Sequence, residues 1–81
     1  MSPTPAAEES AKRAALLRPK FGQIYTELDA TRDDAAERII SRTLSASEAA
    51  LLRPKFAELH RHLRQGRDNE AEHLVARVLA K

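Results

Sequence analysis

The 81-residue chain has no cysteine and no tryptophan, and glycine occurs only twice. The lack of cysteine excludes disulfides, thiolate metal sites and a cysteine nucleophile. No apolar run approaches the ~20 residues that cross a bilayer, and no basic segment followed by an apolar one marks a secretory signal. We therefore expect a soluble protein of the cytoplasm.

Positive and negative residues are nearly equal in number: the chain has 14 Lys and Arg and 12 Asp and Glu, which gives a formal net charge of +2. Hydrophobic residues make up 42% of the chain, which is typical of a folded domain rather than a disordered one. The length allows one small domain at most. Aromatic side chains are confined to Phe21, Tyr25 and Phe56.

An internal repeat is the main feature that the sequence does contain. Residues 10–45 align on residues 45–80 without a gap, at a period of 35, and 17 of the 36 pairs are identical. The longest identical block, Ala14–Phe21, recurs as Ala49–Phe56. A fixed period of this length is typical of stacked supersecondary units. The sequence therefore predicts a tandem duplication whose second unit spans residues 46–81.

The second part of each unit has the apolar spacing of a helix. Ala71, Leu74, Val75, Val78 and Leu79 recur at i, i+3, i+4, i+7 and i+8, and the first unit repeats this stripe 35 residues earlier. Asp33 and Asp68 precede the stripes and suit an N-cap or a first turn, and Gly66 is typical of the turn before the second stripe. We predict helices near residues 33–44 and 68–80.

The first part of each unit carries a second apolar stripe, which runs straight through Pro19 or Pro54. A proline inside a helix removes one hydrogen bond, so two structures remain open: one long kinked helix, or two helices with proline in the first turn of the second. We predict helices near residues 8–29 and 46–64, bent near the two prolines.

The ends of these helices complete an all-α prediction with four helices. The spacing of Ser45 and Glu48 is that of a capping box and predicts the start of the third helix. Residues 1–9 lie outside the repeat, and we expect them to form a disordered tail. The two hairpins, residues 10–45 and 46–81, together make one domain.

The segment around the turn at Gly66 resembles a known class of repeats. The ten residues Leu63–Glu72, followed by Leu74, Val75 and Leu79, resemble the tetratricopeptide and pentatricopeptide patterns, which place glycine in the interhelical turn and a small alanine early in the next helix. The resemblance implies a helical hairpin that stacks on similar hairpins and binds protein.

Size and apolar content predict association with another chain. A domain of about this length is marginally stable alone, and repeat stacks generally need at least three units. Two units therefore leave apolar surface to be covered by a homodimer or a protein partner. The residues expected to contact the partner are Leu16, Leu17, Leu51 and Leu52. The alternative is a monomeric four-helix bundle that covers both stripes internally.

A basic segment of the second unit supports a different function. Five cationic residues gather there, with one acid, Glu58, among them: Arg53, Lys55, Arg61, Arg64 and Arg67. Such a strip binds anions, so a small nucleic-acid-binding regulator is the alternative to a protein-binding module. The strip also suits the acidic turn at residues 27–37 of another protomer. A solvated helix face is the plainer explanation.

No motif in the sequence points to catalysis, a metal or a cofactor. Two glycines cannot build a phosphate loop, and no nucleophile elbow is present. The acidic stretch that begins at Asp29 lacks the glycine and glutamate of a calcium loop. We expect His60, His62 and His73 to be ordinary surface residues rather than ligands. The sequence therefore predicts a non-enzymatic interaction module.

Overall fold

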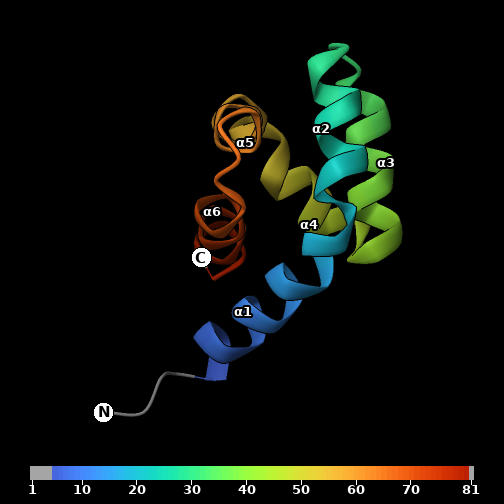
Figure 1. The fold of residues 1–81 in the computed structure, drawn as a ribbon. Coiled ribbons are helices and arrows are strands. Elements are labelled where there is room, and N and C mark those ends of the chain that lie inside the picture. The colour runs from blue at the N-terminus through green and yellow to red at the C-terminus, as the bar shows by residue number, and fades with distance from the viewer. Residues whose placement is uncertain (1–4, 81) are drawn as a thin grey trace.

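The computed structural model describes residues 5–80, and every secondary-structure element in that range is helical (Figure 1). In chain order the elements are α1 (Pro5–Leu17), the 3₁₀ helix η1 (Arg18–Lys20), α2 (Phe21–Asp29), α3 (Asp33–Thr43), α4 (Ala46–Leu52), the 3₁₀ helix η2 (Arg53–Lys55), α5 (Phe56–Arg64) and α6 (Asp68–Leu79). The predicted all-α fold is confirmed. Within residues 5–80, no helix is both long enough and apolar enough to span a bilayer.

The first helix begins earlier than the sequence analysis predicts. α1 starts at Pro5, and proline suits the first helical position because the amide that it lacks has no partner there. The prediction of a disordered tail is therefore wrong for residues 5–9. The remainder of that tail, residues 1–4, lies outside the described residues.

Both prolines lie in short 3₁₀ turns that join two α-helices. Pro19 is in η1 and Pro54 is in η2, and the flanking residue Leu17 keeps helical backbone angles, φ −80° and ψ −22°. The chain therefore remains helical but tightens for three residues, because proline offers no amide hydrogen to the α-helical ladder. Figure 1 shows α2 leaving α1 in a new direction, so the predicted bend is present.

The helix starts follow local hydrogen-bonding chemistry. Ser45 is the N-cap of α4, where its hydroxyl accepts the amide N–H of Glu48 at 3.2 Å, as the sequence predicts. Asp33 and Asp68 lie in the first turns of α3 and α6, where their charge favours the helix N-terminus. Gly66, in the turn before α6, has φ +72°, the left-handed conformation that glycine adopts most readily.

The core forms where the two segments meet that the sequence analysis assigns to a first and a second unit. α1 packs against α6, α3 against α4, and α2 against α5, so each of these contacts joins a helix of the first unit to one of the second. The buried hydrophobic residues come from all six α-helices: Ala14, Leu17, Phe21, Ile24, Leu28, Ala36, Ile40, Ala49, Leu52, Phe56, Leu59, Ala71, Leu74, Val75 and Val78.

Candidate interaction surface

Adjacent leucines in α1 and α4 have opposite environments. Leu16 and Leu51 are 56% and 53% exposed, whereas Leu17 and Leu52 are 0% and 1% exposed and belong to the core. Successive helical residues point about 100° apart, so one leucine of each pair faces inward and the other outward. The prediction that Leu17 and Leu52 contact a partner is therefore wrong, because the fold already covers them.

An ion pair links the two helices that carry the exposed leucines. Arg13 of α1 donates from Nη2 to Oε1 of Glu48 in α4 at 2.5 Å and from Nε to Oε2, in the bidentate geometry that makes such pairs strong. The two side chains are 30% and 18% exposed. The hydrogen bond from Arg13 lowers the pKa of Glu48 below its ordinary value of 4.5, and the same bond raises the pKa of Arg13.

The exposed leucines lie one helical turn from this ion pair. Leu16 follows Arg13 at i+3, and Leu51 follows Glu48 at i+3, so each leucine shares a helix face with its charged neighbour. The outward-facing residues beside the leucines are also small or apolar: Ala15, Pro19, Ala50 and Pro54 are all exposed. We call Leu16, Leu51 and these four neighbours the outer ridges.

The predicted basic strip is divided by ion pairs. Arg53 donates from Nη1 to Asp34 at 2.6 Å and to Glu37 at 2.5 Å, and these hydrogen bonds, that to Glu37 first, raise the pKa of Arg53. The ammonium of Lys55 lies 3.7 Å from the carboxylate of Glu58. Both cations therefore already have anionic partners, and the structure does not assemble all five predicted residues into one free cluster.

The remaining members of the strip are exposed. Within residues 5–80, the side chains of Arg61, Arg64 and Arg67 make no ion pair. Arg61 and Arg64 lie in the last turn of α5, where positive charge favours the carbonyl end of a helix. The favourable charge at the end of the helix thus explains the positions of Arg61 and Arg64 without a ligand, whereas it does not explain Arg67.

Several carboxylates of the acidic turn at residues 27–37 contact basic side chains of the same chain. Asp34 and Glu37 contact Arg53, and the carboxylate of Asp29 lies 3.3 Å from Nε2 of His60. Asp34 and Glu37 are therefore already paired with one member of the basic strip in the same chain, and pairing of this turn with the strip of another protomer stays a prediction.

Two of the three histidines are less exposed than predicted. The ring of His60 stacks on that of Tyr25, with centroids 5.5 Å apart and planes inclined by 22°. Nδ1 of His62 is buried and has no hydrogen-bond partner among the residues that the structure describes, and His73 is exposed. Among the residues that the structure describes, no three His, Cys, Asp or Glu side chains come together as metal ligands.

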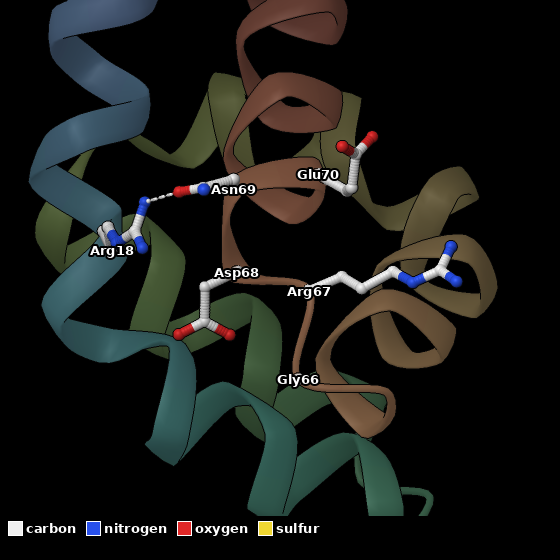
Figure 2. A pocket seen from close by; sticks show the side chains of 6 residues that line it. All are labelled: Arg18, Gly66, Arg67, Asp68, Asn69 and Glu70. Atoms are coloured by element: carbon white, nitrogen blue, oxygen red, sulfur yellow. Dashed lines mark hydrogen bonds between the residues drawn. The ribbon is translucent and has the colours of Figure 1, made fainter.

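An open, polar depression of approximately 430 Å³ lies at the start of α6 (Figure 2). Arg18 donates to Oδ1 of Asn69 at 2.6 Å and to Glu72 at 2.9 Å, whereas Arg67 points away from Arg18. A similar depression of approximately 420 Å³ lies at the start of α3 beside Arg53. Carboxylates line both depressions, and Arg18 in one and Arg53 in the other are already paired, whereas Arg67 and Arg38 at their edges make no ion pair within residues 5–80.

The ion pair of Arg13 with Glu48 escaped the sequence analysis, although one signal for it is present. These residues occupy equivalent positions in the two units and carry opposite charges.

Comparison with protein-family models, curated proteins and solved structures found no match. The resemblance to tetratricopeptide and pentatricopeptide repeats therefore stays a prediction.

Proposed function

We propose that this protein is a small, non-catalytic helical module that associates with a second copy of itself through the outer ridges. The observation that carries this proposal is the exposure of Leu16 and Leu51, the two large hydrophobic residues in residues 5–80 that the fold leaves uncovered. Single exposed apolar residues are common on monomers. Here, however, both leucines border the same ion pair, and small or apolar side chains extend each ridge.

A second copy suits this surface better than a strongly charged partner does. The two ridges have the same chemistry, so an isologous contact brings leucine against leucine. Charges of both signs, Glu9 and Lys12, precede Leu16 on the exposed side of α1, so the surface complements a copy of itself.

The expected dimer is weak. Fully burying a leucine stabilises by ~1.5–3 kcal/mol, so four half-exposed leucines contribute about 3–6 kcal/mol. Association costs roughly 4–15 kcal/mol in lost translational and rotational freedom. The leucines therefore offset only the lower part of this cost, and the smaller ridge residues supply the remainder. We expect a dimer whose population depends on protein concentration.

Sedimentation velocity over a series of protein concentrations tests the proposal. Replacing Leu16 and Leu51 by Ser should shift the protein to monomer at concentrations where the parent chain dimerises. The matched control replaces Ala30 and Ala57 by Ser, since both are exposed alanines outside the ridges, and it should leave the dimer intact. A parent chain that stays monomeric throughout the series, or a leucine variant that dimerises equally well, refutes the proposal.

Exposed arginines support a second candidate function, binding to the phosphate backbone of a nucleic acid. Arg61, Arg64 and Arg67 are exposed and make no ion pair within residues 5–80. Three phosphate contacts predict weak binding that falls steeply with salt, with a log–log slope of about −3 on duplex DNA. Mobility shift at low salt should show binding that is lost when all three become Ala.

A charge-matched control separates this strip from general positive charge. Three other exposed arginines, Arg38, Arg42 and Arg77, make no ion pair within the described chain. Their triple replacement by Ala should leave the mobility shift unchanged. Equal loss in both triple variants, or no shift with the parent chain, excludes a specific role for the strip.

A further inference from the structure

The polar contacts between the two repeat units occur as equivalent pairs. Arg18 of the first unit contacts Glu72 of the second at 2.9 Å, and Arg53 of the second contacts Glu37 of the first at 2.5 Å. Residues 18 and 53 are 35 positions apart, as are residues 37 and 72. Exchanging the two units thus converts one contact into the other, so an approximate two-fold axis relates the units at their interface.

Two contacts lie on this axis, because each joins a residue to its own equivalent. Arg13 pairs with Glu48, 35 residues later in the chain. Tyr25 stacks on His60, again 35 residues later. On a two-fold axis, a side chain would face a second copy of itself if two like units paired. Whether the contacts on the axis are favourable therefore depends on whether two like or two unlike units pair.

The other positions at the interface do not distinguish unlike from like units. Many buried interface residues are identical in the two units, as the pairs Ala14 and Ala49, Leu17 and Leu52, and Phe21 and Phe56 show. Two further buried pairs, Ile24 with Leu59 and Ile40 with Val75, exchange one aliphatic side chain for another. The ion pairs away from the axis can also form between like units. Two first units from different copies would place Arg18 opposite Glu37, which again joins opposite charges.

We propose that the interface between the units is one that a second copy of this chain can also offer, and that the Arg13–Glu48 pair restricts it to unlike units. Pairing two first units would bring Arg13 against Arg13, and pairing two second units would bring Glu48 against Glu48. Both side chains are part-buried at this site, so solvent screens the repulsion less than it would between fully exposed charges. The pair thus favours the correct partner and disfavours the incorrect one.

Complementary charge variants of the full chain test this inference. One variant carries Arg13→Glu and the other carries Glu48→Arg, and both also carry Leu16→Ser and Leu51→Ser so that the outer ridges do not contribute. In each variant alone, positions 13 and 48 carry the same charge. Like charges therefore meet on the axis both within one chain and between two copies of it. Mixed together, they offer opposite charges between chains, whether like or unlike units pair.

We expect each variant alone to melt at a lower temperature than the parent with the two serine substitutions. After the two are unfolded together and refolded at high protein concentration, native mass spectrometry should show a 1:1 heterodimer that exceeds either homodimer by about tenfold or more. Circular dichroism of the mixture should recover a higher melting temperature. If one variant does not fold alone, recovery of helix in the mixture still tests the inference.

The matched control is the charge reversal within one chain, Arg13→Glu together with Glu48→Arg. This control restores opposite charges on the axis. It should therefore remain monomeric and melt close to the parent with the two serine substitutions. Two outcomes overturn the inference: a mixture that forms no heterodimer and melts as its separate components do, or homodimers of the separate charge variants that form as readily as the heterodimer. Neither outcome bears on the outer ridges, because every chain in the experiment lacks their leucines.

Discussion

Substituting Leu52 and Leu51 separately should distinguish folding from association. Leu52 is 1% exposed in the core, and truncation of a buried leucine to alanine costs ~2–5 kcal/mol, since it removes apolar contacts and leaves a cavity. At ~0.05–0.15 kcal/mol per residue, a chain of 81 residues has a free energy of unfolding of about 4–12 kcal/mol. Leu52→Ala should therefore remove a large fraction of the stability and lower the melting temperature by at least ~8 °C.

Leu51→Ala is the matched perturbation on the adjacent residue. Leu51 is 53% exposed, so its truncation should change the free energy of unfolding by no more than ~0.5 kcal/mol. It should instead weaken self-association in sedimentation velocity. Urea unfolding followed by circular dichroism, at a concentration where the protein is monomeric, measures both stabilities. Equal destabilisation by the two substitutions, or a Leu52→Ala variant as stable as the parent, would refute the assignment of inward and outward leucines.

Further predictions concern the backbone, a helix cap and acid stability. Gly22→Ala should stabilise α2 by ~0.5–1 kcal/mol in thermal melts, because an added Cβ meets nothing within 4 Å, and an unchanged or lower melting temperature would contradict this. Gly66→Ala should instead destabilise by ~1–2 kcal/mol, because its φ of +72° strains a residue with a Cβ; a neutral result would argue against that conformation. Ser45→Ala should cost ~1 kcal/mol in the urea midpoint through loss of the α4 cap, and an unaltered midpoint would count against the cap. The folded-state pKa of Glu48 lies below its ordinary value of 4.5, so its contribution to stability is present above that pH and lost as the pH falls through the folded-state pKa. Urea titrations across this acidic range should show a smaller loss for Glu48→Gln than for the parent, and parallel losses would exclude the contribution.

The helical architecture follows from local chemistry that can be predicted from the sequence. Apolar spacing indicates which segments are helical, the prolines indicate where the ladder must tighten, and Ser45 indicates where α4 begins. These features depend on residues within a few positions of one another, so a linear pattern records them. The start of α1 at Pro5 is the exception, because residues 5–9 lie outside the repeat that guided the prediction.

The interaction surface depends on how the two units pack, which the linear pattern does not record. Leu16 and Leu17 are equally apolar, and only the position of α6 beside α1 decides which of them is covered. Arg53 belongs to a basic segment in the sequence, yet the fold places it against Asp34 and Glu37 of the other unit. Tertiary structure decides such matters because burial and ion pairing depend on side chains brought together from distant parts of the chain.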